Sequence, residues 1–425
     1  MKKIDVVTLS SVLIGTILEW YDFSLLGSMA SMISIHFFPS KTPLFSLMAT
    51  FAVFASGFIA RPIGGILFGH IGDRRGRRSA LSLTIILMAV PTTLIGLLPT
   101  YETIGILAPI ALIALRLMQG FAASGEYPGA ICFLTEIAPP NKRGFWGSIS
   151  MFGVAGGILL ASAICSILSA VLSNDQMHSW GWRVPFVIGL PLGVVGWYLR
   201  CKVRESDIFT SATATNEVLK LPFKQVLQFN FVSLIKVILL FALSTISFYL
   251  GFVYIAAYLV SAHKLTFHQA LLSNTVGTMI LILFIPLFGY LSDKINRKYI
   301  MIVGAGALFI FSYPIFTLFL EGNLYGLMQG QIVLSLFIAM LVGPMSAAIA
   351  EVFSTLTRYS GIAAGLNIGT SLFGGTCPLI ATYLVNYSGY EAMPCIYPML
   401  FSFLCLVVIF SFQHNPELLL NEATN

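Results

Sequence analysis

Charged residues are scarce in this chain of 425 amino acids. Asp, Glu, Lys and Arg make up 9% of it, whereas hydrophobic residues make up 57%. A soluble domain carries roughly 25% charged residues and covers its surface with them. So few charges cannot cover a globule of this size, which excludes a soluble enzyme. The net charge of +6 comes from short basic clusters between apolar runs, a pattern typical of cytoplasmic loops rather than of a nucleic-acid site.

Cysteines are few as well, and their spacing forms no motif. Most lie inside apolar runs and none forms a CxxC pair, which argues against a disulfide framework and against a metal site. We therefore expect free thiols that pack as small hydrophobic side chains. No cofactor is expected, and a proton gradient is the energy source we consider. The six are Cys132, Cys165, Cys201, Cys377, Cys395 and Cys405.

Long apolar runs dominate the sequence. A helix needs about 20 apolar residues to cross the bilayer core, and backbone groups in lipid must pair within their own helix. The first run starts near Thr8 and is too long for the core of a signal peptide, so we expect it to be retained. The twelve predicted spans are 8–37, 44–71, 79–98, 104–134, 145–172 and 184–201, then 231–260, 268–292, 299–320, 324–350, 359–386 and 391–413.

A polar stretch from Lys202 to about Asn230 divides these spans into six and six. The predicted fold is an all-α membrane protein of twelve transmembrane helices in two six-helix bundles. The predicted domains are residues 1–201, a cytoplasmic linker at 202–230, and residues 231–425.

Lysine and arginine gather in every second loop, where they are expected to face the cytoplasm. The alternate loops, at 99–103, 173–182 and 321–323, are nearly free of cations. Both termini are therefore predicted to be cytoplasmic, in a bacterial inner membrane. The basic residues are Arg74, Arg75, Arg77 and Arg78; Lys142 and Arg143; Arg200, Lys202 and Arg204; Lys294, Arg297 and Lys298; and Arg358.

The two halves repeat each other. A loop that starts at Gly69 and contains Asp73 recurs 220 residues later, with Gly289 and Asp293 at the same offsets. A Glu and an Arg seven residues apart occur after the fourth and the tenth spans, as Glu136 with Arg143 and Glu351 with Arg358. Parallel six-helix repeats place a substrate site between the halves, near the middle of the membrane.

These motifs resemble those of the major facilitator superfamily. The loop Gly69-His-Ile-Gly-Asp73-Arg-Arg-Gly-Arg-Arg78 is similar to its signature, and the second copy has Asn296 in place of a glycine. Further stretches resemble the metabolite:proton symporters, a group that includes proline/betaine and α-ketoglutarate carriers. The resemblance implies two bundles related by a pseudo-two-fold axis. The stretches are Leu18-Glu-Trp-Tyr-Asp-Phe23, Ala60-Arg-Pro-Ile-Gly-Gly65, Arg116-Leu-Met-Gln-Gly120 with Gly125-Glu126, and Phe373-Gly-Gly-Thr-Cys-Pro378.

Three charged residues inside the spans are candidates for proton coupling, since a charge at mid-helix costs about 2.5–3.5 kcal/mol on insertion scales. Glu19 and Asp22 lie three residues apart and share a helix face. In a low dielectric they should not both ionise, so we expect one to carry the proton. Arg116, at mid-depth of the fourth span, is the third candidate, because the resemblance implies proton transfer or substrate binding there. The alternative is a fixed ion pair between Arg116 and Glu19 or Asp22.

The predicted substrate site combines cations, amides and aromatic rings. Arg116 could bind a carboxylate through two hydrogen bonds, and Arg61 could contact the substrate or serve as a gate or pairing residue. Gln119 and Asn367 are candidate hydrogen-bond partners. Aromatic faces attract quaternary ammonium groups, so the aromatic residues could form a cage, although ordinary packing explains them as well. The candidate cage residues are Trp20, Tyr21, Tyr249, Tyr254 and Tyr258.

The remaining charged residues are predicted to form gates or conformational locks, with topology alone as the alternative. A carboxylate in such a loop can pair with an arginine and a helix dipole, then release them when the protein opens. The candidates are Asp73, Arg74, Arg77, Arg78, Glu126, Glu136, Arg143, Asp293, Arg297, Glu351 and Arg358.

The sequence thus predicts a transporter and no enzyme. The favoured function is proton-coupled symport, by alternating access, of a small carboxylate-bearing metabolite or osmolyte, with a proline- or betaine-like zwitterion favoured over an organic acid. The alternatives are a proton-independent uniporter or exchanger, and a membrane sensor that does not transport. The expected partners are the solute, protons and the lipid bilayer, without nucleic acid, and the chain is expected to be monomeric.

Overall fold

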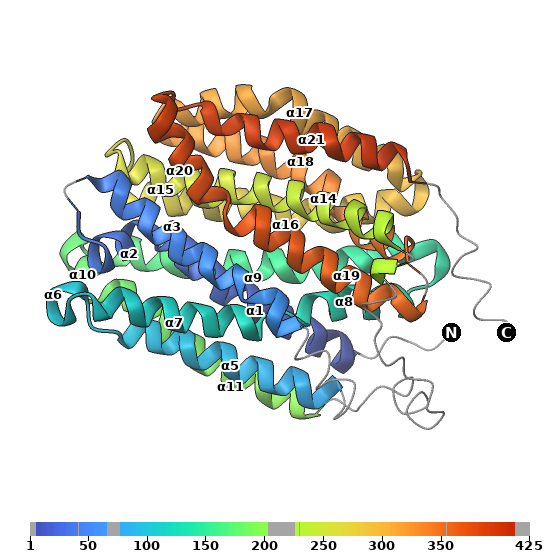
Figure 1. The fold of residues 1–425 in the computed structure, drawn as a ribbon, viewed down its shortest axis with the longest axis horizontal. Coiled ribbons are helices and arrows are strands. Elements are labelled where there is room, and N and C mark those ends of the chain that lie inside the picture. Colours follow the sequence, from blue (N-terminus) through green and yellow to red (C-terminus); the bar gives the residue numbers. More distant parts are fainter. Residues whose placement is uncertain are drawn as a thin grey trace.

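The computed structural model describes residues 6–40, 42–65, 77–202, 226–228, 230–353 and 355–412. Long helices run roughly side by side along one axis (Figure 1). In the first half the α-helices, long and short, are α1 (Val6–Ser28), α2 (Ala30–Phe37), α3 (Pro43–Ile59), α5 (Arg77–Leu97), α6 (Tyr101–Ile104), α7 (Leu107–Ala122), α8 (Glu126–Ile137), α9 (Arg143–Val171), α10 (Asn174–Ser179) and α11 (Val184–Lys202).

In the second half two of the helices contain π-helical segments. The elements are α14 (Phe231–Phe248), η3 (Tyr249–Tyr254), α15 (Ile255–Ser261), α16 (Phe267–Lys294), α17 (Arg297–Leu320), α18 (Leu324–Ala350), α19 (Thr355–Gly369), η4 (Thr370–Gly375), α20 (Cys377–Ser388) and α21 (Ile396–Phe410). The π-helical segments are η3 and η4. Such segments inside α-helices occur frequently at functional sites.

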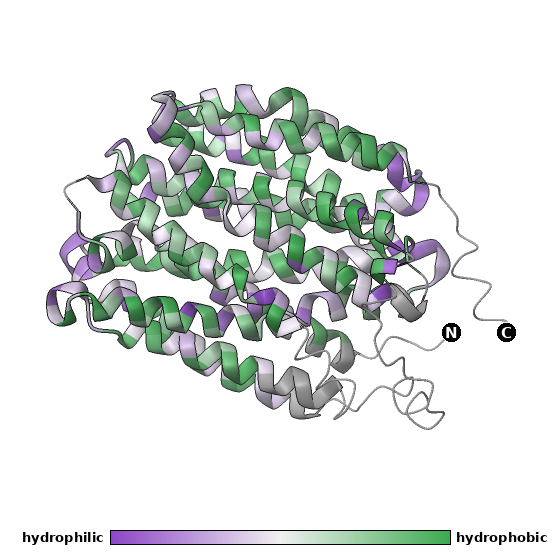
Figure 2. Cartoon of the chain, in the orientation of Figure 1, coloured by the Kyte–Doolittle hydropathy of each residue, from purple (hydrophilic) through white to green (hydrophobic). Residues whose placement is uncertain are grey.

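The predicted spans coincide with these helices, singly or as consecutive pieces such as α1 with α2 and α7 with α8. Within the described residues, nine helices are long and apolar enough to cross a membrane. Hydrophobic residues cover most of the helix lengths and hydrophilic ones gather towards the two ends of the bundle (Figure 2). The all-α membrane fold is therefore confirmed. Residues 1–5 and 413–425 lie outside the described residues, and the cytoplasmic placement of both termini stays a prediction.

Each half packs mainly on itself, and a few helices join the halves. In the first half α1 packs on α9 and α11, and α7 packs on α3 and α5. In the second half α18 packs on α16 and α17, and α14 packs on α19 and α21. Between the halves α9 contacts α16 and α18, α3 contacts η4 and α20, and α8 contacts α19. Most of the predicted linker, 203–225, lies outside the described residues, so the domain boundaries stay a prediction.

Backbones approach closely where two glycines face each other on α3 and α7. A Cβ added at Gly120 would overlap the carbonyl group of Gly57. Small residues allow such approach in membrane helices, which associate through close packing. The contact matters for the site because it brings α7, with its buried arginine, against α3.

This contact predicts a selective loss of stability. Gly120→Ala should destabilise the protein by roughly 1–3 kcal/mol through overpacking. The matched control is Gly306→Ala on α17, where an added Cβ meets nothing within 4 Å; there the better helix propensity of alanine should leave stability equal or slightly higher. Thermal unfolding of both purified variants, followed by the loss of the folded-protein peak in size exclusion after heating, measures the difference. Equal midpoints would contradict the prediction.

Candidate functional site

Four charged side chains are buried together in the first half. Glu19 and Asp22 lie one turn apart on α1, Arg61 follows the end of α3, and Arg116 lies on α7. Asp22 is 5% exposed, and the other three are fully buried. Charges this deep in an apolar bundle need partners, because the cost of removing them from water is high.

Arg61 has such partners. Its Nη2 lies 2.5 Å from Oε1 of Glu19 and donates to the carbonyl of Ala123 at 3.0 Å. Its Nε donates to Oδ1 of Asn367 at 3.2 Å, and Asn367 in turn donates to the carbonyl of Ser124 at 2.9 Å. Asn367 belongs to α19, so Arg61 joins the two halves as well as α1 and α3. This geometry places Arg61 as a pairing residue.

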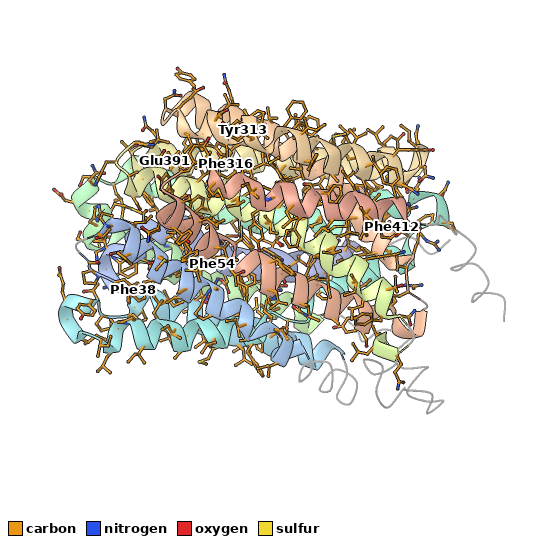
Figure 3. All side chains as sticks on the ribbon, turned by 45° about the horizontal axis from the view of Figure 1, so that its top comes forward. Phe38, Phe54, Tyr313, Phe316, Glu391 and Phe412 are labelled. Carbon is orange, nitrogen blue, oxygen red and sulfur yellow. The ribbon has the colours of Figure 1, made fainter. Side chains whose placement is uncertain are left out.

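Arg116 is much less well paired. Its Nη1 donates to Oε1 of Gln119 at 3.1 Å, and the guanidinium stacks over Phe23 and Phe54 at 4.3 and 5.2 Å. Within the described part of the chain, its Nε and Nη2 have no hydrogen-bond partner and no carboxylate lies within ion-pair distance. Phe54 lies midway along the bundle in Figure 3. The fully buried guanidinium thus keeps two unused donors.

Asp22 lies close to Arg116 without forming an ion pair with it. Its carboxylate is beside Thr92 of α5 and within electrostatic reach of Arg116. Thr92 also accepts a hydrogen bond from Nε2 of Gln119 at 2.6 Å. Gln119 therefore links Thr92 to Arg116.

A cavity of about 50 Å³ lies between the two halves. Its wall comes from α1, α8, α9, α14, η3, α16, α18 and η4, and it is largely apolar and aromatic, with one serine, two threonines and two tyrosines. The lining residues are Trp20, Tyr127, Met151, Val154, Ala155, Ile158, Phe241, Ser244, Thr245, Phe248, Tyr249, Leu281, Ile285, Ile338, Val342 and Thr370.

Trp20 and Tyr249 connect this cavity to the charged cluster. Trp20 follows Glu19 in α1, and the Arg61 guanidinium lies 5.8 Å from its ring. Tyr249 packs on Phe54 at 5.3 Å between ring centres and is within electrostatic reach of both Arg61 and Arg116. The indole nitrogen of Trp20 and the hydroxyl of Tyr249 are buried and have no hydrogen-bond partner among the described residues. The cavity wall therefore offers unused donors on the side of the charges.

The structure brings together only part of the predicted aromatic cage. Trp20 and Tyr249 line the cavity, but Tyr21 donates to the carbonyl of Pro185 on α11 at 2.7 Å. Tyr254 and Tyr258 stack on each other at 5.6 Å and do not line the cavity.

Three aromatic residues that line the cavity were not predicted from the sequence. They are Tyr127, Phe241 and Phe248. Tyr127 directly follows the predicted gate residue Glu126, and this position next to a functional candidate could have indicated that it lines the cavity. Phe241 and Phe248 stand in a run of apolar residues on α14, where nothing in the sequence distinguishes a lining residue from a packed one.

Several predicted lock residues meet at the end of the bundle that is predicted to be cytoplasmic. Asp293, at the end of α16, accepts hydrogen bonds from the backbone N–H groups of Gly144 and Phe145 at 2.7 and 2.8 Å. These amides belong to the first turn of α9, where the helix dipole favours a negative charge. Arg297 lies 2.9 Å from Glu351, so α17 and α18 are joined at the same end.

The other predicted lock residues have different positions. Arg143 lies within electrostatic reach of Glu351 and Arg297, and Arg358 donates to the carbonyl of Ala350 at 2.9 Å. Glu126 is the buried first residue of α8. Asp73 and Arg74 lie outside the described residues, as do the side chains of Arg77, Arg78 and Glu136.

Comparisons with known proteins agree with one another. The model "Sugar (and other) transporter" matches residues 7–220, and the model "Major Facilitator Superfamily" matches residues 237–424. A putative proline/betaine transporter of Staphylococcus aureus (strain MSSA476) is 36% identical over 406 residues, which are 94% of this chain and 86% of the relative. The proline/betaine transporter of Escherichia coli (strain K12) is 34% identical over 425 residues, 97% of this chain and 84% of the relative.

A solved structure shows the same fold. The xylose transporter XylE from E. coli, in a partially occluded inward-open conformation, aligns with a TM-score of 0.76 at 19% identity. The alignment covers 96% of this chain and 97% of that chain.

The contact between Asp293 and α9 leads to a testable prediction: weakening it should favour opening of the end that is expected to face the cytoplasm. Asp293→Asn keeps the side-chain shape but loses the charge and one of the two acceptor oxygens. Since hydrogen bonds to charged groups contribute about 1.5–3 kcal/mol, the closed arrangement should be populated at least about tenfold less relative to the open one. A cysteine introduced by Ser148→Cys, on α9 beside Gly289, should then react faster with a thiol reagent. Asp175→Asn, at the opposite end, is the matched control, and a rate unchanged by Asp293→Asn would contradict the assignment.

Proposed function

Because the chain belongs to the major facilitator superfamily, we propose that it is a proton-coupled symporter of a small zwitterion with one carboxylate, working by alternating access between its two halves. The matches confirm the resemblance predicted from the motifs, and the chain is a multi-pass secondary transporter of a small solute in a bacterial membrane. Its relatives named proline/betaine transporters support a zwitterionic solute.

The unused edge of Arg116 carries the proposal. Nε and Nη2 stand side by side on the guanidinium, and together they match the two oxygens of a carboxylate. Both atoms are buried and have no hydrogen-bond partner among the described residues. A buried charge without a partner is costly, so a bound carboxylate would relieve this cost. Phe54 covers the guanidinium and packs on Tyr249, so the solute reaches Arg116 from the cavity by displacing these two rings.

The cavity wall supports an ammonium group at the other end of the solute. Trp20, Tyr127 and Tyr249 present aromatic rings to a space that, among the described residues, is lined by no charged side chain. Such rings attract quaternary and cyclic ammonium groups through cation–π contacts. A dicarboxylate would need a second free cation, but Arg61 is already paired with Glu19.

Asp22 is the proposed proton carrier. It stands within electrostatic reach of Arg116 and forms no ion pair with any described residue. In the proposed cycle protonated Asp22 leaves Arg116 to the carboxylate of the solute, and deprotonated Asp22 takes its place when the solute departs. Glu19 stabilises Arg61 through their ion pair, and this pairing makes it the less suitable of the two acids for carrying the proton.

Uptake into proteoliposomes tests the proposal. An inwardly directed proton gradient should drive accumulation of labelled glycine betaine or proline, and a protonophore should abolish it. α-Ketoglutarate at equal concentration should be transported poorly. Accumulation that survives the protonophore would favour the uniporter, and binding without accumulation would favour a sensor.

Substitutions separate the two proposed roles. Arg116→Lys keeps the charge but loses the bidentate edge, so the KM for the zwitterion should rise about 10- to 100-fold. Asp22→Asn should abolish gradient-driven accumulation while counterflow of preloaded solute persists, because the neutral amide imitates the protonated acid. Lys236→Ala, on the surface of α14, is the control for both. A KM left unchanged by Arg116→Lys would remove the arginine from the substrate site.

A further inference from the structure

The helix formed by α14, η3 and α15 changes its hydrogen-bonding pattern next to the cavity. The backbone N–H of Ile255 donates to the carbonyl of Leu250, five residues earlier. In an α-helix it would donate four residues back, to Gly251. The π-helical segment therefore takes the N–H of Ile255 away from the Gly251 carbonyl, at a buried position where an unpaired carbonyl is costly.

A glutamine from a different helix supplies the missing donor. Nε2 of Gln331, on α18, donates to the carbonyl of Gly251 at 2.8 Å. The approach is close because Gly251 has no side chain: an added Cβ would overlap Leu334 of α18.

An asparagine on a third helix completes the arrangement. Nδ2 of Asn274, on α16, donates to the carbonyl of Phe252 at 2.7 Å, and its Oδ1 accepts from Nε2 of Gln331 at 2.6 Å. Ser273 donates to Oε1 of Gln331 at 2.6 Å and fixes the orientation of that amide. Gln331 and Ser273 are fully buried, and Asn274 is 5% exposed. Such a satisfied polar network specifies one arrangement of the helices that contribute to it.

The polar network lies between the cavity and the contact of α15 with the first half. On one side of it, Tyr249 lines the cavity. On the other side, α15 packs against α2 and α3 at the end of the bundle predicted to face outward (Figure 1). Val253 packs over Gly27 of α1 there, where an added Cβ would meet its Cγ2 at 3.1 Å. Asn274 also lines a smaller cavity of about 10 Å³ together with Gly27.

We propose that the side-chain amides of Gln331 and Asn274 form a latch that holds the π-helical segment and thereby keeps α15 closed against the first half. Both are positioning residues: they touch the carbonyl groups of Gly251 and Phe252 rather than the solute. Release of the latch lets the segment return to regular α-helix, which turns α15 relative to α14 and separates it from α2. The inference rests on the alternating access proposed above but on neither the solute nor the proton.

Thiol labelling tests the latch without any solute. Val253→Cys is introduced into the full chain in intact cells, and its rate of reaction with a membrane-impermeant maleimide is measured against the chain without that cysteine. Gln331→Met, which keeps the side-chain length, should raise the rate about tenfold, as expected when a buried hydrogen-bond partner is lost. Gln329→Met, an exposed position on the same helix, is the matched control and should leave the rate unchanged.

Two further measurements separate a latch from general destabilisation. Ser148→Cys, at the opposite end, is labelled with a membrane-permeant maleimide and should react no faster in Gln331→Met than in the parent; equal acceleration at both ends would overturn the proposal, as would an unchanged rate at Val253→Cys. Asn274→Ser should act in the same direction, and it decides the question alone if Gln331→Met does not reach the membrane. The double variant should label no faster than the faster single variant, because both belong to one network. Faster labelling without uptake of betaine or proline would uphold the latch and reject the proposed solute.

Discussion

The need to pair every polar group inside an apolar bundle governs this structure. Arg61 meets it with a carboxylate, a carbonyl and an amide, which leave only its Nη1 without a partner among the described residues, and so it joins α1, α3 and α19. Arg116 meets it only in part, with one neutral amide and two aromatic rings. The two arginines therefore differ in role: Arg61 holds helices together, and Arg116 keeps two unused donors, which the proposed function assigns to a solute.

The two ends of the bundle are closed by different means. At the predicted cytoplasmic end a carboxylate of the second half binds the first turn of a helix in the first half. At the predicted outer end α15 packs on α2 and α3, and the proposed latch is a polar network behind it. A charged contact closes one end and packing closes the other, and such a difference fits the alternating access proposed for this chain.

Hydropathy alone predicted the positions of the spans, because an apolar run long enough to cross a membrane must be helical. It also identified the buried charges, since any charge within such a run is an exception to be explained. It could not predict that Arg61 rather than Arg116 would pair with Glu19, because pairing depends on how α3 and α7 pack. The π-helical segments were missed for a similar reason: Gln331 replaces the hydrogen bond lost at Gly251 from 80 residues away. Tyr127 was missed because one aromatic residue beside a charge carries little signal.

The closure by Asp293 uses main-chain groups on the α9 side, and this limits how substitution can weaken it. Every residue except proline provides the same amide hydrogen, so positions 144 and 145 can change their side chains without removing a donor. Proline is ordinarily favoured in the first turn of a helix, where the N–H groups have no partner within the helix. In this transporter those groups donate to Asp293 of the opposite half, so a proline at either position would remove one of the two hydrogen bonds that close this end.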